Sequence, residues 1–301
     1  MNKTPFNKPP LSLSEQVELI KKRGVIINDD SQAHKLLASI GYYRMSAYWY
    51  PFRMRENGHV LSEFEKETNF DQVIFLYEFD RSLRLLIMDA IERIEIAIRA
   101  TMANELAPKY TPFFHAEALN FHPNFNHSKW LRGVTEEVKR SSDEFIKHYQ
   151  EKYHNFPTVP IWCTTEVMSL GKLSFMYQGL KNDDKKLVSD HFNLHHKRLA
   201  NWLHVITYVR NVCAHHSRLW NRELAIRPDQ TKDENWLPPT TPRNDRIFYV
   251  LLMLHQLLKV LSNSQDWKTQ LENLIDTISH DQKAMQMMGF ADNWKEHPLW
   301  K

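Results

Sequence analysis

The chain is poor in glycine, with seven among its 301 residues. Tight turns and phosphate-cradling loops depend on glycine, because it adopts backbone angles that other residues avoid. Folds rich in sheet use glycine repeatedly, so its scarcity favours helices joined by short connections. Hydrophobic residues make up 42% of the chain and charged residues 25%. This balance is typical of a globular protein that buries a core.

Cysteine and long apolar runs are also scarce. Cys163 and Cys213 are the two cysteines, and no Cys-x-x-Cys pair occurs. This pattern argues against a disulfide framework and against a cysteine zinc site. The apolar run over residues 249–254 is far too short to span a bilayer, and the N-terminus lacks the apolar segment of a signal peptide. We therefore expect a cytoplasmic protein with no membrane partner.

The hydrophobic periodicity predicts an all-α fold with no strands. The first helix is expected over residues 14–23 with Ser14 as its N-cap, and the second over residues 31–40, stopping at Gly41. The longest begins at residue 70 or 71 and stops at residue 106, before Pro108. Further helices are expected over residues 128–153, 162–180, 194–216, 243–262 and 265–279, with a long loop over residues 223–242.

The longest predicted helix carries two patterned faces. Glu95 and Arg99 stand in the favourable order for an i,i+4 ion pair, and Arg84 shares their face because eleven residues return to nearly the same angle. Two interpretations stay open: a surface pair worth a few tenths of a kcal/mol, or a polar stripe that faces Arg210 and helps to orient it. The apolar positions that predict a core stripe are Leu83, Ile87, Ile91, Ile94 and Ile98.

The net charge of +3 is small, but its distribution is uneven. No Asp or Glu occurs from residue 191 to residue 222, and six histidines lie in this stretch. A surface of this kind concentrates polyanions and makes their binding dependent on salt. The stretch therefore indicates a nucleic-acid partner. Its cations are Lys197, Arg198, Arg210, Arg218 and Arg222.

Helical spacing separates the side chains at the end of this stretch. Asn211 and His215 are expected to be i,i+4 neighbours on one face, with Arg210 between that face and a buried stripe. His216 belongs to the stripe, which predicts an ordinary packed histidine rather than a reactive one. The stripe consists of Trp202, Ile206, Val209, Cys213, His216 and Trp220.

Arg210, Asn211 and His215 together suit cleavage of a phosphodiester without a metal. A histidine with a pKa near 6.5 takes a proton from a ribose 2′-hydroxyl or gives one to the departing 5′-oxygen. An arginine fork stabilises the charge that grows on the phosphoryl oxygens. Asn211 holds the imidazole or binds a phosphate oxygen. This chemistry predicts RNA as the substrate and a 2′,3′-cyclic phosphate as the product, and it needs no cofactor.

The same residues carry a family resemblance. Arg210-Asn211-x-x-x-His215 resembles the R-x4-6-H signature of the HEPN superfamily, and the string RNVCAHHSRLWNR from Arg210 onward resembles the hallmark of the Abi-like abortive-infection proteins (AbiD/AbiF type) within it. The resemblance covers about residues 15–225, which leaves residues 243–301 as a helical extension of one domain, 1–301. The other segments that agree are residues 41–44, 77–84, 92–99, 160–166 and 169–174.

The resemblance implies properties that spacing alone does not. HEPN proteins are helical bundles and usually homodimers, in which two R-x4-H helices meet across the two-fold axis to form one composite site. Abi-like relatives are phage-defence or toxin-like ribonucleases, related to the nuclease modules of type VI CRISPR effectors, and some are held in check by an RNA or protein partner. The residues that could support the site or bind RNA are Glu95, Arg99, Arg218, Arg222, Lys197 and Arg198.

Three alternatives to cleavage remain. Adjacent histidines invite a metal, but zinc needs three or four converging ligands and helical neighbours point about 100° apart. A binding protein would use the same basic face to hold RNA, or another partner, without cutting it. The aromatic block over residues 42–52 could stack on bases or form a partner surface, although core packing is the expected role of such side chains.

Overall fold

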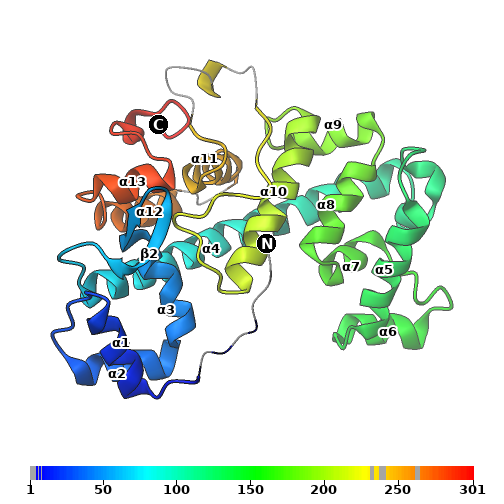
Figure 1. The fold of residues 1–301 in the computed structure, drawn as a ribbon. Helices are drawn as coiled ribbons and strands as arrows, with labels where there is room; N and C mark the ends of the chain where they lie inside the picture. The colour runs from blue at the N-terminus through cyan, green and yellow to red at the C-terminus, as the bar shows by residue number, and fades with distance from the viewer. Residues whose placement is uncertain (1–4, 6, 8, 231–233, 237–241, 262–264) are drawn as a thin grey trace. The chain divides into compact units, whose positions relative to one another are not determined.

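The computed structural model describes residues 5, 7, 9–230, 234–236, 242–261 and 265–301 (Figure 1). Across these residues the protein is mostly helical, with 13 α-helices, five short 3-10 helices and one two-stranded hairpin. The predicted helical class is therefore confirmed, whereas the predicted absence of strands is wrong. None of the described helices is both long and apolar enough to cross a lipid bilayer.

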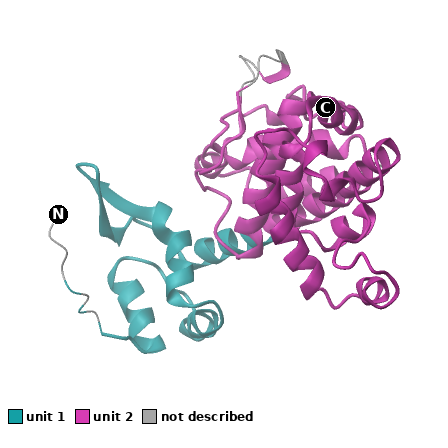
Figure 2. Ribbon diagram, turned by 90° about the vertical axis from the view of Figure 1, so that its right-hand side faces the viewer, with its two compact units in different colours: residues 1–82 teal, residues 83–301 magenta. Residues whose placement is uncertain are grey.

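The chain divides into two compact units, residues 1–82 and residues 83–301, coloured separately in Figure 2. The division falls inside α4 (Phe70–Lys109). The first unit contains α1 (Leu13–Lys22), α2 (Asp30–Ile40), α3 (Tyr42–Trp49), the 3-10 helix η1 (Tyr50–Phe52) and the strands β1 (Arg53–Glu56) and β2 (His59–Phe64).

The start of α1 corrects the sequence prediction. Its N-cap is Ser12 rather than Ser14, which lies inside the helix. The Ser12 hydroxyl accepts from the Glu15 N–H at 3.3 Å, and the Glu15 carboxylate accepts from the Ser12 N–H at 2.7 Å. This reciprocal capping box needs a glutamate three residues after the cap, a spacing that Ser12 has and Ser14 lacks. The predicted end of α2 at Gly41, where φ is 87°, is confirmed.

The aromatic block is largely core. Tyr48 and Trp49 are fully buried, and the Tyr48 hydroxyl donates to Asp80 Oδ2 at 2.7 Å. Trp49 packs edge-on against Phe64, with ring centroids 6.4 Å apart. Tyr43 and Tyr50 are exceptions, with 90% and 42% of their surfaces exposed. Core packing of the block is therefore confirmed for its largest side chains.

The hairpin follows directly after this block. Glu56 pairs with His59, so Asn57 and Gly58 form a two-residue loop. Both have positive φ, at 50° and 80°, as a type I′ turn requires. Asn-Gly is the dipeptide that best tolerates those angles, and it is the sequence signal for these strands.

The second unit contains helices and loops but no strand among its described residues, apart from one isolated bridge between Phe121 and Leu180. It continues α4 and adds α5 (His127–Arg140), α6 (Glu144–Lys152), α7 (Ile161–Val167), α8 (Leu170–Gly179), α9 (Asn182–Asp190), α10 (His196–Ala214), α11 (Ile247–Leu258), α12 (Gln265–Asp276) and α13 (Gln282–Met288). Four 3-10 helices accompany them: η2 (Phe114–Ala116), η3 (Ala118–Asn120), η4 (Glu234–Trp236) and η5 (Trp294–Glu296).

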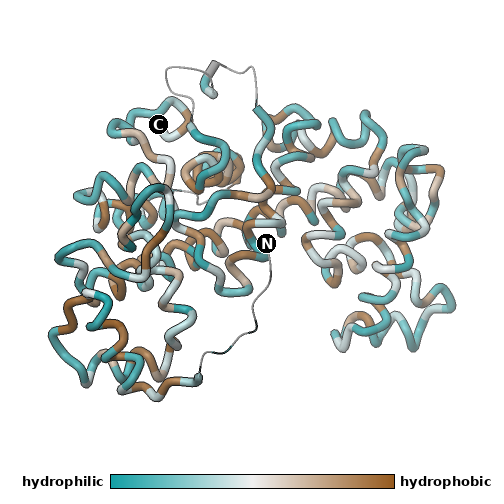
Figure 3. The backbone as a smooth tube through the Cα atoms, in the orientation of Figure 1, coloured by the Kyte–Doolittle hydropathy of each residue, from teal (hydrophilic) through white to brown (hydrophobic). Residues whose placement is uncertain are grey.

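The packing of the second unit centres on its most apolar helices. α10 packs against α8 and α9, and α8 packs against α5. α11 is buried almost all round and stands out as hydrophobic in Figure 3. The Trp267 indole on α12 donates to the Leu86 carbonyl on α4 at 2.7 Å. The predicted core stripe of α4 is confirmed, because each of its residues is at most 1% exposed: Leu83, Ile87, Ile91, Ile94 and Ile98.

Predicted helix boundaries are wrong at three further places. The helix expected over residues 128–153 breaks at Ser141, whose hydroxyl accepts from the Asp143 N–H at 3.2 Å and so offers that backbone group an alternative to helical pairing. The helix over residues 162–180 breaks at Met168 and Ser169, while Gly171 lies inside α8. Pro108 does not end α4, because it lies in the last turn and the helix continues for only one residue beyond it, to Lys109.

Two buried histidines predict how the stability of the protein depends on pH. Burial lowers the pKa of His115 and of His255 to about 4 each, with nearby positive charge adding to the effect. In an unfolded chain a histidine titrates near pH 6.5. These groups therefore leave stability unchanged above about pH 7. Between about pH 6.5 and pH 4 the unfolded state takes up protons that the folded state refuses, so stability falls.

We expect each histidine to lower the free energy of unfolding by at most about 1.4 kcal/mol per pH unit in that window. Urea unfolding at several pH values from 7.5 to 4.5 measures this slope. His255→Phe should remove about half of the contribution of the two histidines, whereas His280→Gln, at an exposed position, should keep the wild-type slope. Identical slopes for wild-type protein and His255→Phe would contradict the assignment.

Candidate functional site

The end of α10 brings the predicted catalytic residues together. α10 stops at Ala214, with His215 as its C-cap. The His216 N–H donates to the Cys213 carbonyl at 2.9 Å, and the Ser217 N–H donates to the Val212 carbonyl at 3.0 Å. These two bonds form a Schellman motif, which reverses the chain at the residue after the cap. His215 is exposed at this reversal.

His216 corrects the sequence analysis. Its φ is 54°, in the left-handed region, and its side chain is exposed rather than packed in the core. Extending the helical stripe past Ala214 assigned it to the core, but the reversal rotates it out of register with Cys213. Trp220 is buried, although it lies beyond the end of the helix. The other stripe residues, Trp202, Ile206, Val209 and Cys213, are buried as predicted.

Arg210 and Asn211 contact each other directly. Arg210 Nη1 donates to Asn211 Oδ1 at 3.2 Å, and Asn211 is exposed while Arg210 is half-buried. The Asn211 carbonyl also accepts from the His215 N–H at 3.0 Å, which ties the backbones of the two residues. Asn211 therefore orients the guanidinium through its side chain and the C-cap histidine through its backbone. The three residues lie within the last turn and cap of one helix.

A hollow of about 510 Å³ lies beside Arg210 and is formed by α4, α7 and α10. Arg99 and Glu95 line it together with Arg210, so the polar face of α4 does reach the Arg210 region. Neither Asn211 nor His215 is among the described lining residues. The hollow has an excess of negative charge, because four acidic residues and two arginines line it. The acids are Asp89, Glu92, Glu95 and Glu166.

The Arg99 side chain binds the backbone at the end of α7. Its guanidinium pairs with Glu95 and donates to the Thr165, Glu166 and Met168 carbonyls, with 2.7 Å to Glu166 and 2.8 Å to Met168. The carbonyls at the end of a helix have no helical partner, so a cation there satisfies them. The side chains of the pair are only 13% and 15% exposed. Glu95–Arg99 is therefore neither a solvated surface pair nor a direct contact of Arg210.

Two of the other predicted cations lie far from Arg210. Lys197 and Arg198 lie in the first turn of α10, so about 20 Å of helix separates them from Arg210. Arg222 Nε donates to the Arg218 carbonyl at 2.8 Å, which fixes the loop after α10. His191 pairs with Glu105 at 2.9 Å. The cations at the start of α10 therefore do not share a site with Arg210.

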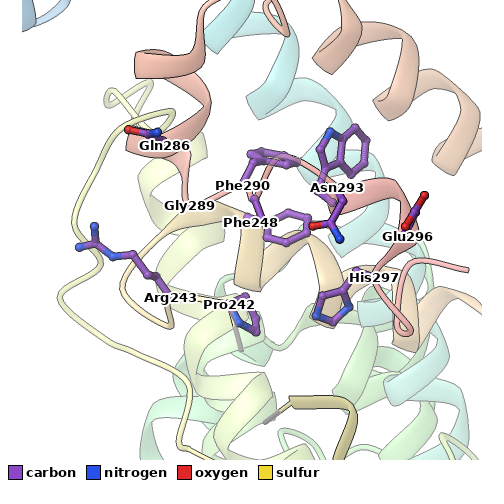
Figure 4. A pocket seen from close by; sticks show the side chains of 11 residues that line it. Pro242, Arg243, Phe248, Gln286, Gly289, Phe290, Asn293, Glu296 and His297 are labelled. Carbon is purple, nitrogen blue, oxygen red and sulfur yellow. The ribbon is translucent and has the colours of Figure 1, made fainter. Parts of the chain in front are cut away.

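Three other cavities lined by described residues contain none of the predicted catalytic residues. One of about 470 Å³ lies near the C-terminus, where Phe248 and Phe290 stack at 4.3 Å (Figure 4). His297 and Asn293 stand beside these rings in Figure 4.

The adjacent histidines at the start of α10 bear on the metal alternative: the ring centroids of His195 and His196 lie 4.3 Å apart. Within the described residues, no group of three or more His, Cys, Asp or Glu side chains converges as metal ligands would.

Comparison with known proteins identifies a family. A family model described as Abi-like protein matches residues 35–221, which is more than half of the chain. The matched segment includes α3 to α10 and contains Arg210, Asn211 and His215. The sequence resemblance to the Abi-like proteins is thereby confirmed. No curated protein and no solved structure matches the chain.

The contacts of Arg99 predict a large effect of a small substitution. Arg99→Lys keeps the charge but cannot reach four acceptors with one ammonium, so we expect a loss of about 2–3 kcal/mol in the free energy of unfolding. Urea denaturation measures it. Arg140→Lys is the matched control, because the exposed Arg140 makes one bond, to the Glu136 carbonyl, and should change stability by less than about 0.5 kcal/mol. Equal effects of the two substitutions would contradict the structural role of Arg99.

Proposed function

Because the chain belongs to the Abi-like protein family, we propose that it is a metal-independent endoribonuclease of the HEPN type. Membership of this family is consistent with a role in abortive infection, so the protein acts in phage defence or as a toxin. The observation that carries the proposal is the exposed end of α10, where Arg210, Asn211 and His215 come together around a helix reversal. An exposed helix end admits a polymer as long as RNA.

The proposed reaction is an internal transesterification. The ribose 2′-oxygen attacks the neighbouring phosphorus and loses its proton to a His215 imidazole, while the bond from phosphorus to the 5′-oxygen breaks. The departing oxygen takes a proton from a second imidazole. Arg210 donates to the phosphoryl oxygens, where negative charge develops, and Asn211 keeps the guanidinium in place. The products are a 2′,3′-cyclic phosphate and a free 5′-hydroxyl.

One chain supplies one His215, whereas the reaction uses a base and an acid. We therefore include a homodimer in the proposal, with one histidine from each subunit. The surface beside Arg210 supports this, because Leu85 is 56% exposed and Ile96 is 58% exposed at the hollow. Exposed apolar residues of this size commonly mark a contact surface. Arg210 and Glu92 lie in the same hollow, and a two-fold contact brings opposite charges of one patch face to face.

RNA is the substrate in this proposal, and a cognate non-coding RNA is a candidate regulator. One alternative function remains, in which the protein binds RNA or another partner without cutting it. Within this alternative the acidic hollow beside Arg210 favours a partner other than RNA, because its four carboxylates repel phosphates. The two functions differ in whether His215 is needed for a chemical product.

An assay of RNA cleavage distinguishes the two functions. We expect His215→Ala and Arg210→Ala each to lower the rate of RNA cleavage at least about 100-fold, because removing a general base or a charge donor costs that much. Binding of RNA should change less than about threefold. Gel analysis of labelled RNA in EDTA, with mass spectrometry of the 2′,3′-cyclic ends, measures the reaction.

His216→Gly is the matched control for His215→Ala. It deletes the adjacent exposed imidazole, and glycine accepts the positive φ at this position, so cleavage should stay within about threefold of wild type. If wild-type protein binds RNA but never cuts it, with candidate partners present or absent, the binding function replaces the enzyme.

The composite site predicts that a monomer is inactive. Ile96→Glu places a charge on the exposed apolar surface of α4 and should convert a dimer into a monomer that does not cleave RNA, although Arg210 and His215 are intact. Light scattering coupled to gel filtration measures the mass. Leu119→Glu is the control, because Leu119 is 86% exposed outside the hollow. A monomer that cleaves at the wild-type rate would show that one subunit suffices.

A further inference from the structure

A second hollow, of about 570 Å³, is lined by residues of α5, α8 and α10, the helices that carry these labels in Figure 1. Its lining is mostly apolar and includes Trp130, Gly171 and Thr207. The Trp130 indole is fixed by donating to the Lys172 carbonyl at 3.1 Å. A Cβ at Gly171 would come within 3.6 Å of Thr207 Cγ2, which shows that α8 approaches α10 closely there. Three packed helices therefore build the hollow.

An accessible aromatic ring stands at this hollow. Phe175 on α8 is 45% exposed, although large apolar side chains are normally withdrawn from water. It packs against Phe125, with ring centroids 5.2 Å apart and an interplanar angle of 51°. The ring is thus braced by a neighbour and still open to solvent. A braced, accessible ring is what base stacking requires.

The charges at this hollow differ from those beside Arg210. No Asp or Glu is among the described residues that line it, whereas Lys129 on α5 and His204 on α10 are exposed at it. Lys172 is engaged by Glu137 at 2.6 Å, so it serves to join α8 to α5. The structure gives the Lys129 ammonium no ion pair with a described residue. The hollow therefore presents an apolar surface next to a lysine ammonium that has no ion pair with a described residue.

His204 lies on the same face of α10 as Asn211 and His215. Seven residues separate His204 from Asn211 and eleven separate it from His215, and an α-helix returns to within about 20° of the same angle at both intervals. The rise over eleven residues is about 16 Å. A single strand of about 4–16 nucleotides, the length that such sites bind, is long enough to cover that distance.

We propose that the hollow between α5, α8 and α10 is a base-binding subsite for single-stranded RNA. Phe175 stacks on one base, Lys129 and His204 contact neighbouring phosphates, and the same strand continues along α10 to Asn211 and His215. This inference rests on RNA being the substrate, as in the proposed function. It adds the route of the strand, which follows the acid-free side of α10 and avoids the carboxylates beside Arg210.

Stacking is tested by binding, in the full chain with His215→Ala so that no RNA is consumed. The probe is a fluorescein-labelled, mixed-sequence single-stranded RNA of 12 nucleotides, followed by anisotropy. Phe175→Leu should weaken binding about tenfold, since leucine keeps apolar bulk but cannot stack. Phe175→Trp should stay within about twofold of the phenylalanine protein. Phe145→Leu, at a ring that is 37% exposed on α6, should have no effect.

The salt dependence of binding tests the phosphate contact. Lys129→Gln should reduce the slope of log affinity against log salt by about 0.7, the value for one phosphate on a single strand. Phe175→Leu should leave that slope unchanged, because stacking releases no counterions. Lys147→Gln, at an exposed lysine on α6, is the control and should keep the wild-type slope. Unchanged melting temperatures would show that the variants are folded.

The outcomes separate the subsite from the proposed function. RNA that binds with the expected dependence on Phe175, but is never cut by protein with His215 intact, supports the subsite and refutes the enzyme. RNA that is bound and cut equally well by Phe175→Leu and wild-type protein refutes the subsite and leaves the enzyme. A crosslink from 4-thiouridine in the RNA to the Phe248–Phe290 pocket instead of the Phe175 peptide also refutes it, as does the absence of RNA binding.

Discussion

The Arg99 guanidinium is the interaction on which the arrangement of the site depends. It pairs with Glu95 on α4 and gathers three backbone carbonyls at the end of α7. A buried charge costs much free energy unless it is fully paired, and here four acceptors surround it. The clamp sets where α7 ends and so places Glu166 at the hollow beside Arg210. It is a positioning element and leaves phosphate contacts to other cations.

The end of α10 is organised by backbone geometry rather than by side-chain pairing. The Schellman motif places His215 at the cap and forces His216 into the left-handed region, where residues other than glycine carry strain of about 1–2 kcal/mol. Two adjacent histidines thereby occupy different backbone conformations. Strain held at an exposed position by an otherwise well-bonded helix end is common at functional sites. This difference makes the two histidines a matched pair for experiments.

Charge divides the surroundings of α10 into two kinds of surface. The hollow shared with α4 and α7 has an excess of carboxylates and exposed apolar residues, which suits contact with another protein surface. The hollow shared with α5 and α8 has an accessible aromatic ring and exposed Lys129 and His204, which suits a nucleic acid. One helix can therefore serve a dimer contact and an RNA contact without competition between them.

Local patterns in the sequence account for much of this protein. The stripe from Leu83 to Ile98, the Glu95–Arg99 pair, the stop at Gly41 and the family resemblance depend on residues close together along the chain, where helical spacing decides which side chains meet. The same reasoning was wrong where a local hydrogen bond ended a pattern, as at Ser141 and His216. It also missed the strands on either side of Asn57-Gly58, although this dipeptide is itself a hairpin signal.

Tertiary structure decided what no spacing could. Arg99 and the end of α7 lie more than 60 residues apart in the chain, and the fold brings them together. The carbonyls at the end of α7 need a donor, which Arg99 supplies. Lys197 and Arg198 do not share a surface patch with Arg210, because about 20 Å of helix separates them. The accessible ring of Phe175 and the carboxylates beside Arg210 likewise depend on which helices pack together. The sequence by itself determined the helical class, the family and the residues at the end of α10, whereas packing between distant helices decided which charges and rings surround them.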